Sequence, residues 1–161
     1  MKLRLAVILF FSSVLIGCVT TPYKPIETSE VISIPAQSQK DIYNKTRQWF
    51  SQNSVSGKSV VDYEDPETGT IIGNGIADIG TDMLGIIKYS INYNIRVDTK
   101  DGKFRALTTI VKHTNTVSSS TYTVHNVSEK RNKLATEHVK KIVQDIKAYV
   151  TNDRHDSNSN W

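Results

Sequence analysis

The only cysteine of the chain, Cys18, carries its most reactive side chain, because an ionised thiol is a strong nucleophile. It follows an uncharged run, residues 5–16 (LAVILFFSSVLI), which itself follows the positive residues Lys2 and Arg4. About 20 apolar residues are needed to cross a membrane, so this run is too short for a transmembrane helix. Its length and its positive start are typical of a signal peptide, which we predict over residues 1–17.

The residues that end this run, Leu15-Ile16-Gly17-Cys18, resemble the lipobox of bacterial lipoproteins. The resemblance implies a diacylglyceryl thioether on Cys18, cleavage between Gly17 and Cys18, and acylation of the new amino terminus with chains such as palmitate. Two or three acyl chains anchor firmly, because each buried CH2 adds about 0.8 kcal/mol. Val19 stands where enterobacterial inner-membrane lipoproteins carry Asp, so the resemblance favours the outer membrane, facing the periplasm.

Composition excludes several classes of function. A single cysteine that carries lipid leaves no thiol for an intrachain disulfide or a cysteine zinc site. Removal of residues 1–17 takes away Lys2 and Arg4 and so lowers the formal net charge of +4 by two units. The weakly positive remainder lacks the basic stripe of a nucleic-acid-binding protein. We therefore expect no nucleic-acid partner, and we expect a membrane contact through the lipid on Cys18.

Other residue types that could do chemistry have simpler explanations. Four acidic residues could together supply oxygen ligands to Ca²⁺, but their spacing favours a solvated hairpin tip: Asp62, Glu64, Asp65 and Glu67. The four histidines are scattered, and His138 borders the apolar stripe of a helix. Because no Gly-x-Ser-x-Gly, His-x-x-x-His or dinucleotide fingerprint is present, we expect no enzyme, no metal and no cofactor.

The mature chain is predicted to contain one domain, over 31–150, since about 120 residues suit a single core. Residues 18–30 form a lipidated N-terminus and a proline-containing tether. The polar segment 151–161 is expected to be a disordered tail.

Within the domain, hydrophobic periodicity predicts the order β-α-β-β-β-β-α. The fold class is therefore α+β, an antiparallel sheet of about five strands with two helices packed on one face. The predicted elements are strand 31–36, a helix from about 38 to 54, strands 58–64, 70–79, 88–98 and 103–113, and a helix from 128 or 129 to 150.

Strand 88–98 has the clearest pattern, because Tyr89, Ile91, Tyr93, Ile95 and Val97 alternate with polar residues. Period two places one set on the core and the other on a wet face. The sheet face not covered by helices is therefore the candidate interaction face, and on this strand it carries Ser90, Asn92, Asn94 and Arg96.

Three other segments leave alternatives open. Gly73, Gly75 and Ala77 would form a shallow groove in which a helix could sit. The apolar connection 81–87 is either a buried strand start or an exposed contact tip. The connector 115–127 is long and polar, so it is either functional or mobile.

The order of elements and certain residues resemble a bacterial domain-of-unknown-function family with a TATA-binding-protein-like fold. The resemblance covers residues 30–150 and rests on Trp49-Phe50, VVDYEDPETGTIIGNG at 60–75 and YSINYNIRVDTKDGKFRALTTIV at 89–111. It implies the fold and an exported or lipid-anchored protein, and it supplies no functional residues. Fold alone does not imply DNA binding.

The resulting hypothesis is a lipid-anchored, non-catalytic module that binds an envelope protein or a wall component. The alternative is a periplasmic carrier of a small apolar ligand between the sheet and the C-terminal helix. Tight packing under Leu134, Val139, Ile142 and Ile146 would leave no room for such a ligand. An enzyme would require a cleft in which a histidine meets a carboxylate.

Overall fold

The structure, a computed structural model, describes residues 23–53 and 59–152. Gly17, Cys18, the signal peptide and residues 153–161 lie outside the described residues. The elements are β1 (Ile26–Ser33), α2 (Gln39–Asn53), β2 (Ser59–Asp65), β3 (Thr70–Thr81), β4 (Ile87–Lys100), β5 (Lys103–Val117), β6 (Ser120–Val124) and α3 (Glu129–Thr151).

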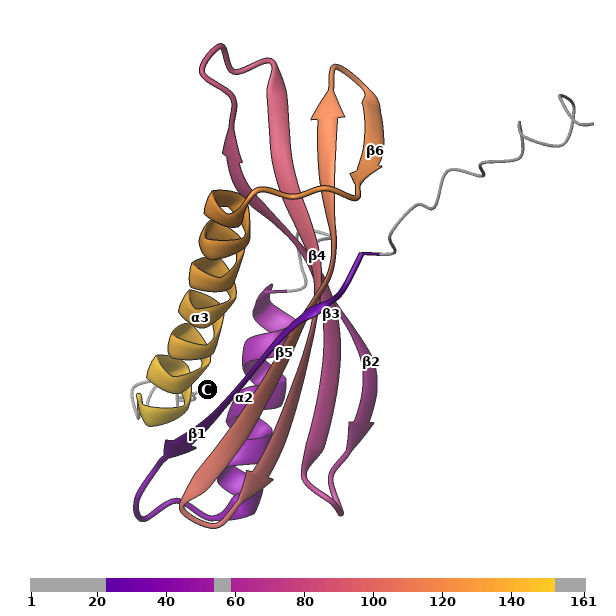
Figure 1. Cartoon of the computed structure of the whole chain (residues 1–161). Coiled ribbons are helices and arrows are strands. Elements are labelled where there is room, and N and C mark those ends of the chain that lie inside the picture. The colour runs from indigo at the N-terminus through magenta and orange to yellow at the C-terminus, as the bar shows by residue number, and fades with distance from the viewer. Residues whose placement is uncertain (1–22, 54–58, 153–161) are drawn as a thin grey trace, which may run out of the picture.

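The strands form one antiparallel sheet in the order β1-β5-β4-β3-β2, and β6 also pairs with β5. β1 pairs with the first half of β5 and β6 with its last residues, so both use the same edge of that strand. Figure 1 shows α2 and α3 together on one face of the sheet. The predicted fold class is confirmed, with six strands among the described residues in place of about five.

The core lies between the two helices and the sheet. On β4 the predicted alternation is present, since Ile91, Ile95 and Val97 are at most 1% exposed. From α2, Trp49 and Phe50 pack edge to face with ring centroids 5.2 Å apart. The apolar stripe of α3 closes the core with Ala135, Val139, Val143, Ile146 and Val150. Removal of this apolar surface from water is the main driving force for the fold.

Local hydrogen bonds fix where α2 begins. Ser38 Oγ accepts from the backbone N–H of Asp41 at 3.2 Å and donates to its carboxylate at 2.6 Å, so Ser38 caps the start of the helix. Asp101, in the β4–β5 turn, accepts from the N–H of Gln39 at 2.7 Å. The turn is therefore bound to the start of the helix, which sets the position of α2 under the sheet.

Two segments differ from expectation. β1 begins at Ile26, inside the predicted tether 18–30, because β5 offers a free edge and the hydroxyls of Thr28 and Thr108 form a 2.6 Å hydrogen bond. The connector 115–127 contains the rest of β5 and β6, so most of it is a hairpin with a turn at Ser118, where φ is +53°. β6 is almost wholly exposed and so had no alternating burial pattern to reveal it.

Candidate functional site

The candidate interaction face lies on the side of the sheet that the helices leave uncovered. Asn94 and Arg96 are exposed there and Asn92 is half-buried. The structure corrects the prediction that Ser90 is exposed on this face. Ser90 is only 5% exposed and donates a 2.9 Å hydrogen bond to Asp78 on β3. Its short side chain lies between larger cross-strand neighbours, so alternation alone overstated its accessibility. The usable part of the predicted face is therefore Asn92, Asn94 and Arg96.

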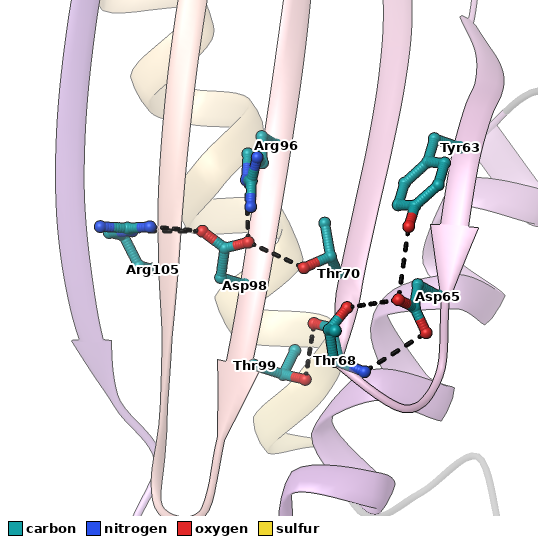
Figure 2. A network of polar contacts seen from close by, with 9 residues as sticks. Tyr63, Asp65, Thr68, Thr70, Arg96, Asp98, Thr99 and Arg105 are labelled. Carbon is teal, nitrogen blue, oxygen red and sulfur yellow. Dashed lines mark hydrogen bonds and ion pairs between the residues drawn. The ribbon is translucent and has the colours of Figure 1, made fainter.

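Next to Arg96, the carboxylate of Asp98 organises a network across three strands (Figure 2). Arg96 Nε donates to it at 2.9 Å, Arg105 Nη2 at 2.7 Å and Thr70 Oγ1 at 3.0 Å. The Asp98 side chain is 17% exposed, whereas those of Arg96 and Arg105 are 46% and 56% exposed. One carboxylate therefore holds two guanidinium groups in fixed positions at the protein surface.

The charge state of this network follows from its contacts. Burial alone would raise the pKa of the Asp98 carboxyl, but hydrogen bonds from Arg105, Arg96 and Thr70 outweigh it and hold that pKa below its usual value. A depression of about 280 Å³ adjoins the network. It is lined by Val31, Asp98, Lys100, Lys103, Phe104 and Arg105. Its charged lining is mainly cationic, so it suits an anionic group on a ligand or partner.

Sequence reasoning placed Arg96 on this face but did not connect it to Asp98, Arg105 or Thr70. A usable signal existed, because the short turn Asp101-Gly102 sets Lys100 opposite Lys103 and hence Asp98 opposite Arg105. The partner from β3, Thr70, depends on long-range strand pairing that the sequence pattern did not specify.

Three of the four acidic residues of the β2–β3 hairpin, Asp62, Glu64 and Asp65, make structural contacts. Asp65 accepts from Thr68 Oγ1 at 2.8 Å and from the N–H of Glu67 at 2.9 Å, and the Thr68 hydroxyl contributes most to lowering the pKa of Asp65 (Figure 2). Glu64 pairs with Arg47 of α2 at 2.7 Å, and Asp62 accepts from the side chain of Asn74. Over residues 23–53 and 59–152, no three His, Cys, Asp or Glu side chains gather as a metal site.

A second concave feature is an open groove of about 480 Å³ between the helices and the edge of β3. Its lining comes from α2, β3, β4 and α3: Trp49, Asn53, Ile76, Ala77, Asp78, Tyr93, His138, Lys141, Ile142 and Asp145. Tyr93 lies over Gly75, where a Cβ atom would clash with the phenol ring. The space that the sequence offered to a helix at Gly75 is therefore filled by an aromatic ring from the neighbouring strand.

This groove brings a histidine and carboxylates to the same surface, a combination that sequence spacing did not reveal. Burial and the charge of Lys141 lower the pKa of His138, and Asp78 opposes them. Both carboxylates have other partners, since Asp78 pairs with Lys88 at 2.8 Å and Asp145 accepts from Trp49 Nε1 at 2.8 Å. The groove therefore combines apolar and polar lining residues, and its carboxylates are already engaged in structural contacts.

His113 is buried in the core under the start of α3. Its side chain is 0% exposed, and Tyr23 contacts it edge to face with ring centroids 5.9 Å apart. Neither ring nitrogen has a hydrogen bond of ordinary geometry within the described part of the chain. Burial and then the charge of Arg131 lower the pKa of His113 to about 4, and the nearby side chain of Asn132 opposes them. The ring is therefore neutral at physiological pH.

Packing under α3 bears on the carrier alternative. Val139 and Ile146 are at most 1% exposed, whereas Ile142 is half-buried and Leu134 is 40% exposed. The middle of the helix thus fills the space against the sheet. A further groove of about 490 Å³ lies on the other side of α3 and is lined by Thr28, Ser29, Glu30, Ala106, Thr108, Lys140, Val143 and Gln144.

The connection 81–87, left open by the sequence, is an exposed hairpin tip. Met83, Leu84 and Ile86 are 103%, 78% and 56% exposed, and we call these three residues the apolar tip. No helix in the described residues is long and apolar enough to cross a membrane.

Comparisons with known proteins identify the family. Residues 29–114 match the domain of unknown function DUF4468 with TBP-like fold, and the chain belongs to this family. A DUF4468 family protein from Bacteroides ovatus superposes with a TM-score of 0.62 at 19% identity, over 86% of this chain and 93% of that one. A TBP-like protein from Parabacteroides distasonis gives a TM-score of 0.59 at 18% identity, over 81% and 97% of the two chains. No curated protein matches the chain.

Proposed function

We propose that this protein is an envelope lipoprotein, anchored through lipid on Cys18 in the outer membrane, whose periplasmic domain is a non-catalytic binding module. The anchor is supported by the lipobox-like residues 15–18 behind a short apolar run. The partner is an envelope protein or a component of the cell wall. No cofactor is needed for this role.

The observation that carries the binding role is the fixed pair of arginines on the helix-free face. Guanidinium groups recognise carboxylates and phosphates through paired hydrogen bonds. Because Asp98 already orients Arg96 and Arg105, little side-chain freedom remains to be lost when an anionic partner binds. Asn94 adds an exposed amide beside them. The partner surface should therefore carry carboxylates or other anionic groups.

The two alternatives receive less support from the geometry. A carrier of an apolar ligand needs an enclosed apolar space, whereas Val139 and Ile146 are packed against the sheet. The grooves beside α3 are open to solvent, and charged residues line them together with apolar ones. An enzyme needs a base oriented toward a substrate. The carboxylates near His138 are instead held by Lys88, Ser90 and Trp49. Both alternatives stay predictions.

The anchor and the binding role are tested on the full-length protein extracted gently from its own membranes. Native mass spectrometry should show a thioether lipid on a chain that begins at Cys18, together with a bound partner. The Arg96→Glu variant should lose the partner. The control is Arg47→Glu, which reverses an equally exposed, carboxylate-paired arginine on α2. An unlipidated chain would refute the anchor, and equal loss in both variants would refute the assignment of the binding face.

A further inference from the structure

The hairpin between β3 and β4 ends in side chains that turns seldom expose. Turn positions usually carry Gly, Asn, Asp or Ser, yet Met83, Leu84 and Ile86 project into water. The connection contains one charged residue, Asp82, and its carboxylate accepts a 2.8 Å hydrogen bond from the N–H of Ile87. The single charge is thus turned back onto the hairpin, and the tip itself is apolar.

The hairpin is built to hold these residues in place. The N–H of Asp82 donates to the carbonyl of Ile87 at 3.0 Å, and that of Gly85 donates to the carbonyl of Asp82 at 3.1 Å. Gly85 has φ of +70°, a conformation that glycine adopts without strain. The tip is therefore a defined turn that presents large apolar side chains at one end of the molecule, where it projects beyond the start of α3 (Figure 1).

The chain that leads to the predicted anchor approaches from the same end. β1 runs from Ile26, opposite Ile110, to Ser33, opposite Lys103, so it enters from the side of the hairpin tip. Tyr23 contacts His113, and His113 pairs with Ile91. The start of the described chain is therefore level with Ile91, four residues along β4 from the end of the strand nearest the hairpin tip.

Chain lengths allow the anchor to reach the level of the base of the hairpin turn. From Ile91 to Ile87 the strand extends four residues, or about 13 Å at the usual rise, and the turn lies beyond. Five residues separate Cys18 from Tyr23, and an extended chain of that length spans at most about 17 Å. The turns at the opposite end of the sheet, Asp65-Pro66-Glu67-Thr68-Gly69 and Asp101-Gly102, are polar. Among the turns that the structure describes, 81–87 is thus the one that exposes large apolar side chains and suits a lipid surface.

We propose that the apolar tip, Met83, Leu84 and Ile86, inserts into the interface of the bilayer that holds the lipid on Cys18, as a second membrane contact. This inference rests on the proposed anchoring through Cys18. Amphipathic elements that bury an apolar edge at the headgroup boundary bind more firmly when combined with a lipid anchor. The two contacts together would fix the orientation of the domain on the membrane.

The test places a nitroxide label at the tip of the full-length lipidated protein. With Cys18 lipidated, Leu84→Cys creates the single free thiol, and Glu67→Cys at the opposite end is the matched control. Each labelled protein is reconstituted into vesicles of phosphatidylethanolamine and phosphatidylglycerol. Power saturation then compares collisions of the label with oxygen, which enters the bilayer, and with a nickel chelate, which stays in water.

The expected oxygen-to-nickel ratio at position 84 is several times that at position 67. Equal ratios would overturn the inference, and so would a label at 84 that is shielded from both reagents, because shielding from both reports a protein contact. Intact-mass measurement of the same samples separates the two proposals. Lipid on Cys18 with a water-exposed label at 84 refutes the tip contact alone, whereas a chain without lipid refutes the anchor and this inference together.

Discussion

Acidification should destabilise the domain through His113 well before its carboxylates titrate. The buried ring has a pKa of about 4, against the ordinary value of 6.5 expected in the unfolded chain. Between these two values the unfolded chain binds a proton that the folded chain does not, so stability falls as the pH drops below 6.5. Linkage with these two pKa values predicts a loss of about 2 kcal/mol between pH 7.5 and pH 5.

The origin of this effect is visible in the structure. Protonation would place a charge on a ring that is 0% exposed, beside the cation Arg131, which itself stacks 4.2 Å above the ring of Tyr89 and donates to Asn115. No acidic side chain contributes to the pKa of His113, and the side chain of Asn132 offsets only part of the effect of burial and of Arg131. The loss of stability on protonation therefore falls mainly on the contact between the start of α3 and the end of the sheet nearest the apolar tip.

The measurement is urea unfolding followed by tryptophan fluorescence, to which buried Trp49 contributes, at pH 7.5, 6.5, 5.5 and 5.0. The variant His113→Leu removes the titrating group but keeps an apolar side chain of similar bulk, and His125→Gln changes an exposed histidine as a control. The free energy of unfolding of His113→Leu should depend less on pH than that of the wild type, and His125→Gln should follow the wild type. Identical pH dependence in wild type and His113→Leu would refute the reasoning.

Three other perturbations have defined outcomes. Gly75→Ala should lower the free energy of unfolding by about 1 to 3 kcal/mol, because the new Cβ would clash with the ring of Tyr93. Chemical denaturation measures this loss, and adding Tyr93→Leu to the same chain should restore part of it. Asp98→Ala should cost about 1 to 2 kcal/mol by removing charge-assisted hydrogen bonds whose half-exposed arginine partners regain water; a thermal melt that matches the wild type would contradict this. Replacing all three residues of the apolar tip by serine should change the free energy of unfolding by less than about 0.5 kcal/mol, because the side chains contact mainly water in the isolated domain. When bound to vesicles, the hairpin of the same triple variant should be less protected from protease than the hairpin of the wild type. Digestion in the presence and absence of vesicles measures this protection.

The sequence predicted those elements whose burial has a period. β4 was placed within two residues at each end, because Ile91, Tyr93, Ile95 and Val97 point to one face over the whole strand. α3 was placed equally well by its apolar stripe. β6 and the first half of β1 were missed because they are held by edge hydrogen bonds on β5 and bury almost no apolar side chains. Hydrophobic periodicity in a sequence reflects the burial of alternate side chains, and an exposed edge strand buries few side chains.

The candidate sites show a similar division. Arg96 could be assigned to the helix-free face from alternation alone, but the burial of Ser90 between its cross-strand neighbours Asp78 and Thr114 could not be predicted. A bulge at Ile79 in β3 and another at Val111 in β5 shift the register beside this part of β4. The groove near His138 joins residues from four elements, so it depends on helix packing that no local pattern specifies. The exposure of the apolar tip likewise could not be predicted from the sequence, because it depends on whether another element of the fold packs over the turn.

The position of the Asp98 network along β4 has a consequence for the partner. Eleven residues separate Ile87, at the base of the apolar tip, from Asp98, which is about 36 Å along an extended strand. With the tip and the lipid on Cys18 at one membrane, the two exposed guanidinium groups would face the space several nanometres away from it. A partner embedded in the same bilayer would need a large soluble part to reach them. The geometry therefore favours an anionic partner in the periplasm or in the wall. A crosslinker at position 94 should capture such a partner and a crosslinker at the apolar tip should not, and this result would support both proposals together.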